Sequence, residues 1–210
     1  MRIERLTATT AIVLLTVAVS MLVTLSPYAQ DIQVLAGFIP ARLSGGLAFP
    51  GLTAVPAWLT PLSCALIHAG VLHLGTNMLM LGFTGSATER ALGPRGLVVL
   101  YLVGAYAAAF AQWLAGPLST TPMIGASGAA SAVVGAYSLL YGQPRAKAIG
   151  PIPARAVHVI WLAVAWTLVN LLMAKAFLPD VAIAAAAHIG GFFAGLALAG
   201  PLFRWRWRKA

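Results

Sequence analysis

Two polar residues with the chemistry of an acyl-transfer site, Ser127 and His188, stand inside long apolar stretches of this chain. A serine hydroxyl becomes a good nucleophile when a neutral histidine within hydrogen-bonding reach accepts its proton. Polar side chains in such apolar stretches are costly unless they face the protein interior, so each one is a candidate functional residue. We therefore take Ser127 as the candidate nucleophile and His188 as its candidate general base.

His73 and Asn77 are the candidate donors to the oxyanion that acyl transfer creates. They stand four residues apart, so they project from the same face of a helix. Removing one donor from a preorganised oxyanion site raises the barrier by roughly 3–4 kcal/mol. The backbone N–H of Ser127 is a further candidate if a helix begins there, because the first amides of a helix lack acceptors within it.

The chain has only four acidic residues, and none is well placed to orient His188. Asp180 precedes His188 by eight residues, which is about 12 Å along a helix axis. We therefore expect a Ser-His dyad rather than a triad. The other acids are Glu4, Asp31 and Glu89.

The composition indicates that the elements carrying these residues lie in a membrane. Hydrophobic residues make up 60% of the 210 residues and charged residues 8%, whereas a soluble domain has about 25% charged residues. A span needs about 20 apolar residues, and in hydrocarbon only helices or closed barrels satisfy the backbone. Strand-like alternation is absent, so we expect an all-α polytopic membrane protein with a single domain over residues 1–210. Six segments qualify as spans, approximately at residues 7–26, 62–84, 96–115, 123–142, 156–176 and 181–203.

The distribution of Lys and Arg predicts the orientation. When alternate gaps are counted, 11 of the 13 fall on one side, and only Arg42 and Lys175 fall on the other. Because Lys and Arg accumulate on the cytoplasmic side, we expect both termini in the cytoplasm and the 27–61 loop outside. Ser127 and His188 then lie roughly 6–11 Å below the outer surface, where they can meet. The net charge is +9, but the Lys and Arg residues lie in the gaps between spans and do not form one exposed face. We therefore expect no nucleic-acid partner.

Two segments have more than one interpretation, and the 204–209 tail has one. The first apolar segment could be a cleaved signal peptide, but its apolar run exceeds the usual 7–15 residues or so, and we expect it to be retained. The 27–61 loop suits a segment lying in the membrane interface, the alternative being a disordered linker. The 204–209 tail alternates Trp with cations and resembles an interfacial anchor facing anionic lipid.

Small residues accompany the polar set. Gly128 and Gly135 fall in the fourth predicted span, and Gly191 and Gly195 in the sixth, at spacings that allow close helix approach. Taken alone, these glycines would indicate only ordinary helix packing. Together with the polar residues, they predict that the fourth and sixth spans bring Ser127 and His188 together.

These residues match the motifs of a known family, and the chain resembles the rhomboid intramembrane serine proteases over nearly its whole length. The matching motifs, in chain order, are His68-x-x-x-x-His73-x-x-x-Asn77, Gly125-Ala126-Ser127-Gly128 and His188-x-x-Gly191-x-x-x-Gly195. Their order and distribution over the second, fourth and sixth spans make the combination specific. Glu89 and Gly93 are similar to a structural Glu and Gly of the family.

The resemblance implies a six-transmembrane-helix bundle that cleaves transmembrane protein substrates near or within a membrane span, with no metal or cofactor. Ser127 would attack the peptide bond, and His188 would act first as base and then as acid. His73, Asn77, Gly125 and Gly128 would form the oxyanion and substrate-binding region, supported by His68, Gly191 and Gly195. It also implies the cytoplasmic (inner) membrane of a bacterium, with the site toward the outer leaflet.

Two positions depart from the family pattern. The family commonly has an aromatic residue four positions after the nucleophile, packed on the catalytic histidine, whereas this chain has Ser131. The family also tends to have a Trp-Arg pair nine residues before the first motif histidine, where this chain has Leu59-Thr60. We therefore expect His188 to be held by another side chain, or to be held less firmly, and the outer loop to dock differently.

Two other functions are compatible with parts of the pattern. A catalytically inactive rhomboid-like protein could act in membrane binding or quality control, but such a protein would be expected to lack the nucleophile or the base. A metal-dependent membrane hydrolase or transporter could use His68, His73 and His188. However, the first two are about 140° apart around a helix, and the chain has no HExxH motif.

Overall fold

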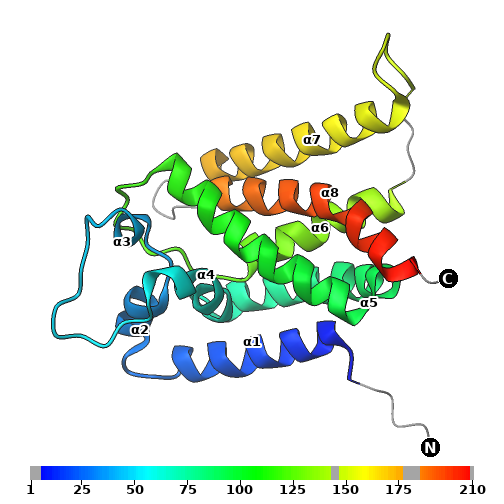
Figure 1. The fold of residues 1–210 in the computed structure, drawn as a ribbon. Helices are drawn as coiled ribbons and strands as arrows, with labels where there is room; N and C mark the ends of the chain where they lie inside the picture. Colours follow the sequence, from blue (N-terminus) through cyan, green and yellow to red (C-terminus); the bar gives the residue numbers. More distant parts are fainter. Residues whose placement is uncertain (1–5, 143–146, 177–184, 209–210) are drawn as a thin grey trace, which may run out of the picture.

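The computed structural model describes residues 6–142, 147–176 and 185–208, and the regular elements within them are all helices. The only β contacts in these ranges are two isolated bridges. The all-α class predicted from the sequence is therefore confirmed. The helices are α1 (Ala8–Thr24), α2 (Ala29–Ala36), α3 (Pro40–Leu43), η1 (Ala57–Leu59), α4 (Thr60–Ser63), η2 (Cys64–Leu66), α5 (Val71–Ala115), α6 (Ser127–Tyr141), α7 (Ala154–Ala176) and α8 (Ala185–Trp207), arranged as in Figure 1.

The second and third predicted spans correspond to the two arms of α5, which a sharp, non-helical bend at Gly93 separates. Gly93 has φ 74° and ψ 166°, a left-handed conformation that favours glycine, and Pro94 follows with no N–H to continue the helix. The chain reverses there, and the two arms of α5 run back alongside each other (Figure 1). The loop expected between these spans is thus reduced to a bend.

Two helices that carry candidate residues begin later than the predicted spans. The first arm of α5 begins at Val71 instead of residue 62, because residues 60–66 form the short elements α4 and η2. Helix α6 begins at Ser127 instead of residue 123, because Met123 pairs with Phe38 in an extended bridge. Apolar composition cannot distinguish a long helix from a helix preceded by a buried irregular segment.

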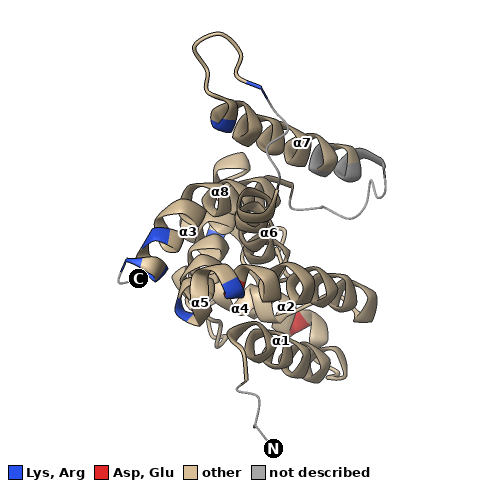
Figure 2. Cartoon of the chain, turned by 90° about the vertical axis from the view of Figure 1, so that its right-hand side faces the viewer, with Lys and Arg blue, Asp and Glu red and all other residues tan. Residues whose placement is uncertain are grey.

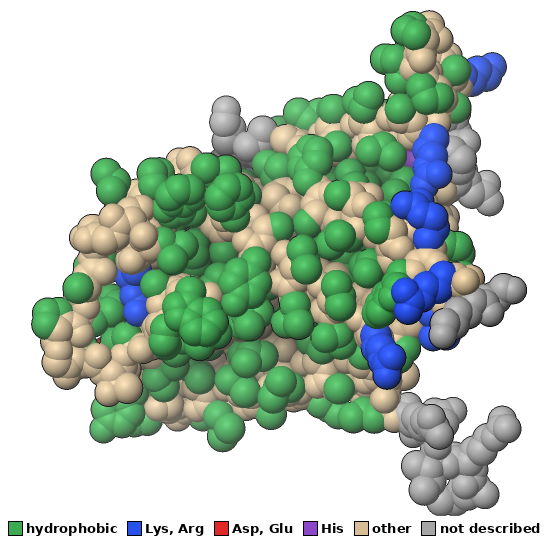
Figure 3. Space-filling view, viewed as in Figure 1, with side chains coloured by type: hydrophobic (Ala, Val, Ile, Leu, Met, Phe, Trp, Pro, Cys, Tyr) green, Lys and Arg blue, Asp and Glu red, His purple; other side chains and the backbone are tan. Residues whose placement is uncertain are grey.

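The outer surface of the bundle is strongly apolar. Helices α5 and α8 are long and apolar enough to cross a membrane, and α1 and the 154–169 part of α7 are shorter apolar helices. Large side chains such as Leu72, Leu79 and Trp161 are more than 60% exposed, and hydrophobic side chains cover much of the face in Figure 3. A soluble monomer rarely exposes so extensive an apolar surface, whereas a lipid environment would cover it.

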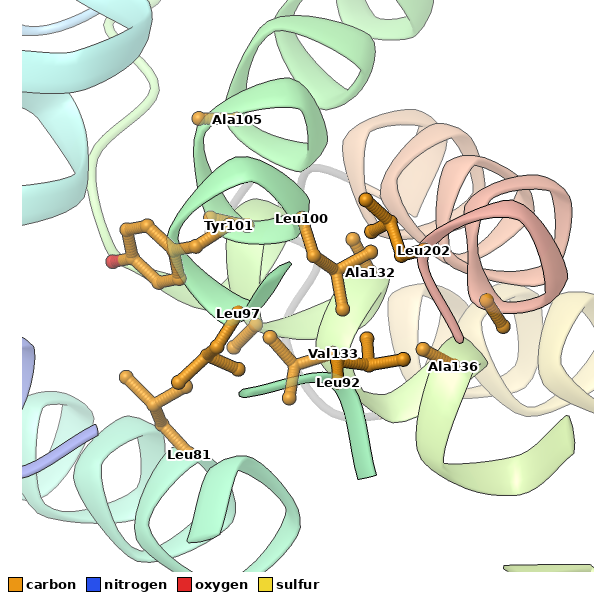
Figure 4. Close-up of a cluster of buried hydrophobic side chains, with 13 residues drawn as sticks. Leu81, Leu92, Leu97, Leu100, Tyr101, Ala105, Ala132, Val133, Ala136 and Leu202 are labelled. Atoms are coloured by element: carbon orange, nitrogen blue, oxygen red, sulfur yellow. The ribbon is translucent and has the colours of Figure 1, made fainter. Parts of the chain in front are cut away.

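The core lies where α5, α6 and α8 meet, and its fully buried members include Leu97, Leu100 and Val133 (Figure 4). Helix α1 packs on one side against α5. Helix α7 packs chiefly against α8 and stands at the edge of the bundle (Figure 2). The central three helices therefore provide the rigid part of the fold, and α7 is joined to it mainly through α8.

Helices α6 and α8 approach closely because small residues lie at their contact. A Cβ atom added at Gly195 would overlap the carbonyl oxygen of Ala132, and one added at Gly135 would overlap that of Phe192. Backbone-to-backbone packing of this kind replaces the hydrophobic driving force that is absent between helices in lipid.

Gly195→Ala should therefore destabilise the protein by about 1–3 kcal/mol, because the added methyl group must push α6 and α8 apart. Denaturant-induced unfolding in detergent measures the change. Gly82→Ala is the matched control, since Gly82 is also helical but a Cβ there meets no atom within 4 Å. The control should be neutral or slightly stabilising, and an equal loss in both variants would contradict the packing explanation.

The segment 27–61 is folded, unlike the disordered linker considered from the sequence. Arg42 connects separate parts of this segment. Its guanidinium donates to the carbonyl oxygens of Val55 (2.7 Å) and Leu35 (3.4 Å) and lies 5.1 Å from the ring centroid of Phe49. This chain thus holds its outer loop with an arginine that follows α2, not with a Trp-Arg pair near residue 59.

Glu89 holds the start of α1 against α5. Its carboxylate accepts hydrogen bonds from the backbone N–H groups of Ala8 and Thr9, both at 2.8 Å, and from the Thr9 hydroxyl at 2.6 Å. Amides at a helix N-terminus lack acceptors within the helix, and a negative charge there also interacts favourably with the helix dipole.

Glu89→Gln should lower the free energy of unfolding by roughly 1–3 kcal/mol, because a neutral amide replaces the charged acceptor of these bonds. The melting temperature in detergent checks this. Asp31→Asn serves as the control, since Asp31 is an exposed acid at the start of α2 and its replacement should cost less than about 1 kcal/mol. Equal melting temperatures for wild type and Glu89→Gln would exclude the capping role.

Candidate active site

Ser127 is the first residue of α6, placed there by a constrained turn. Gly125 has φ 114°, and a Cβ atom at this position would lie 2.8 Å from the His73 ring, so both conformation and space require glycine. The Gly125 N–H donates to the carbonyl oxygen of Cys64 at 2.9 Å. The first amides of α6, that of Ser127 among them, have no acceptor within the helix.

His188 lies in the first described turn of α8, and its Nε2 atom is 2.7 Å from the Oγ atom of Ser127. The two residues are separated by 61 positions in the chain and come from helices that pack side by side. Both side chains are only partly buried. In this geometry a neutral His188 can accept the Ser127 proton directly.

His68 is almost fully buried and joins three parts of the chain. Its Nε2 lies 3.2 Å from the backbone nitrogen of Ala126, and its Nδ1 lies 2.8 Å from Oγ of Ser20 on α1. An amide can only donate, so Nε2 accepts, and Nδ1 carries the proton and donates to Ser20. His68 therefore holds the residue before Ser127 in place and is not itself aimed at the nucleophile.

His73 and Asn77 lie on the same face of α5, as their spacing predicts. Nδ1 of His73 is 3.4 Å from the Ala69 backbone nitrogen, which favours the tautomer with the proton on Nε2, the ring edge that faces Gly125. The Asn77 amide nitrogen donates to the His73 carbonyl oxygen at 2.8 Å, which leaves its second N–H available. Among the described residues, neither side chain is hydrogen-bonded to Ser127.

The motif glycines lie where α6 meets its neighbours. A Cβ at Gly128 would come within 2.6 Å of the Ala108 side chain on α5, and one at Gly191 would overlap the Gly128 carbonyl oxygen. Gly128 and Gly191 thus set the α6–α8 separation next to the Ser127–His188 pair, and Gly195 continues the contact one turn further.

Trp166 of α7 is a site residue that the sequence did not reveal. Its indole N–H donates to the backbone oxygen of His188 at 3.2 Å, and its ring stacks on Phe192 with centroids 4.9 Å apart and planes 10° apart. Ser131, where the family usually has an aromatic, instead donates to the Ser127 carbonyl oxygen at 2.7 Å. The only signal in the sequence was a tryptophan within an apolar span, which cannot indicate its partner.

The structure also bears on the metal-site alternative and on the acidic residues considered for orienting His188. Both ring nitrogens of His68 already have protein partners, so His68 is not available to a metal ion shared with His73 and His188. Asp180, the acid considered for orienting His188, lies outside the described residues, as does part of the expected outer loop before α8. Glu89 is engaged with α1.

Comparison with known proteins identifies the family. Residues 56–205 match the rhomboid domain. The chain is 32% identical over 163 residues to "Rhomboid protein 1, mitochondrial" of Saccharomyces cerevisiae, an alignment that covers 74% of this chain and 44% of the yeast protein. It is 30% identical over 174 residues to "Rhomboid protease GlpG" of Pectobacterium atrosepticum, covering 79% of this chain and 58% of that protein. It is also 31% identical over 144 residues to "Rhomboid-related protein 2" of Mus musculus, covering 68% and 47%.

The chain spans about half the length of these curated relatives. The matched region nevertheless includes α5, α6, α7 and most of α8, and with them every motif residue from His68 to Gly195. A rhomboid domain implies a polytopic fold within a membrane, in agreement with the apolar surface of the bundle. The chain belongs to the rhomboid family.

Proposed function

We propose that this protein is an intramembrane serine endopeptidase that cleaves membrane-anchored proteins near or within a transmembrane segment. The observation that carries the proposal is the 2.7 Å separation of Ser127 Oγ and His188 Nε2. We further propose six spans in one domain, both termini in the cytoplasm, and a site toward the outer leaflet of a bacterial inner membrane. The count of Lys and Arg between spans supports this orientation.

In the proposed mechanism, Ser127 Oγ attacks the carbonyl carbon of the scissile peptide bond while His188 Nε2 accepts its proton. The tetrahedral oxyanion would be stabilised by the Ser127 backbone N–H, the Nε2–H of His73 and the second amide N–H of Asn77. His188 then protonates the leaving amine, and an acyl-enzyme ester remains on Ser127. A water molecule, deprotonated by His188, hydrolyses this ester and restores both residues. No metal or cofactor is needed for these steps.

The reactivity of Ser127 tests the proposal. A fluorophosphonate probe should label the wild-type protein in detergent and should not label Ser127→Ala, because the probe captures a serine activated by a neighbouring base. Gel fluorescence measures the labelling. Ser138→Ala is the control, since Ser138 lies in the same helix three turns from the site, and it should label like wild type.

Absence of labelling in folded wild-type protein would favour the inactive rhomboid-like alternative. Labelling that persists in Ser127→Ala would exclude Ser127 as the nucleophile.

The contact between Trp166 and His188 generates a second test. Trp166→Phe can keep the stack on Phe192 but removes the hydrogen bond to the His188 carbonyl oxygen, so kcat for a model transmembrane substrate should fall about two- to tenfold. KM should change little, because the bond orients the base and does not touch substrate. Trp161→Phe, an exposed tryptophan on the same helix, should leave both constants unchanged. A rise in KM at constant kcat would instead indicate that Trp166 contacts substrate.

A further inference from the structure

We propose that a pocket between the bend of α5 and the end of α8 binds the headgroup phosphate of an anionic phospholipid. The pocket has a volume of about 340 Å³. It lies at the opposite end of α8 from His188 and at the opposite end of the first α5 arm from His73. It is independent of the proposed catalytic function and requires only that the rhomboid domain is embedded in a membrane. Its lining residues are Leu92, Gly93, Pro94, Arg95, Trp205, Arg206 and Arg208.

Among the described residues, no acidic side chain neutralises the positive charge of the pocket. The described residues contain two carboxylates: Glu89 is bonded to the start of α1, and Asp31 lies on α2, away from the C-terminal end of α8 (Figure 1). None of the three arginines forms an ion pair within the described ranges. Guanidinium groups bind phosphate oxygens through paired, charge-assisted hydrogen bonds, so a phosphate is the complementary ligand.

The walls of the pocket are held in position. The Arg206 side chain crosses directly over Gly93, where an added Cβ would lie 2.9 Å from its Nη1 atom. The neighbouring Trp207 donates its indole N–H to the carbonyl oxygen of Ala91 at 3.2 Å, and its ring lies 5.5 Å from the Arg206 guanidinium carbon. The bend of α5 and the last turns of α8 are therefore held together, and the Arg206 guanidinium needs little ordering to bind a ligand.

A second, apolar pocket continues from the first. It has a volume of about 420 Å³, shares Pro94, Arg95 and Trp205 with the basic pocket, and adds Val98 and Val99. These valines stand about one helical turn, or about 5 Å, further along α5 than Arg95. A ligand that fills both pockets must have an anionic group joined to a hydrocarbon portion, which is the chemistry of a phospholipid and not of free phosphate.

The location on the surface agrees with this ligand. Lys and Arg side chains line the end of the bundle that carries the C-terminus, and apolar side chains cover the face beside them (Figure 3). In a membrane this boundary is the headgroup level, where Trp is favoured and where each Lys or Arg near anionic lipid contributes about 1 kcal/mol.

Native mass spectrometry of the full chain in neutral detergent tests the site. Wild type should retain one phosphatidylglycerol molecule at concentrations about tenfold lower than those needed for phosphatidylcholine. The double variant Arg95→Gln with Arg206→Gln should lose most of this preference, because two of the three lining charges are removed. The control is Arg155→Gln with Arg204→Gln, which removes two charges outside the pocket lining and should keep the preference.

Three outcomes would overturn the proposal: equal retention of the two lipids by wild type, equal loss in the control pair, or displacement of the lipid by millimolar glycerol phosphate. The last outcome would show a site for free phosphate instead of a lipid. If the double variant is not monodisperse, Arg208→Gln at the end of α8 replaces it, with an expected loss of about threefold. Unchanged retention in that variant would equally contradict the proposal.

Discussion

The approach of α6 to α8 at Gly128 and Gly191 is the contact on which the candidate site depends. In hydrocarbon, helices gain nothing from mutual burial of apolar side chains, so their separation is set by backbone contact between small residues. Here that contact leaves no room for a methyl group and lies beside the Ser127–His188 pair. The distance between nucleophile and base is consequently fixed by main-chain geometry, which is much stiffer than a pair of side chains on separated helices.

A second layer of polar contacts holds the elements around this pair. His68 joins α1 to the turn before Ser127, Trp166 joins α7 to the backbone of His188, and Glu89 joins the start of α1 to α5. Each of these groups would be costly in an apolar environment without a partner. Each of these bonds joins two separate parts of the chain. The same bonds therefore satisfy the polar groups and orient the helices.

The sequence predicted the helical class, the family and the grouping of Ser127 with His188, because polar residues in apolar spans and small-residue spacings leave a strong pattern. It predicted two spans on either side of Gly93 but not that the two arms of α5 meet there in a bend of a single non-helical residue, since Gly-Pro is equally compatible with a longer loop. The late starts of α5 and α6 were missed because buried irregular segments are as apolar as helices. Trp166 and Arg42 were missed because their partners are backbone oxygens, which no residue pattern reports.

The bend at Gly93 and the outer loop differ in how well each would tolerate an inserted residue. The bend has a single residue of left-handed backbone, with Arg206 packed directly on it, so an inserted residue would change the register of one α5 arm against α6 and α8. In the outer loop, Gly45 and Gly51 also have positive φ, but both are exposed and a Cβ at either position meets no atom within 4 Å. Length variation and engineered epitopes therefore belong near these two glycines, far from the hairpin-like reversal of α5.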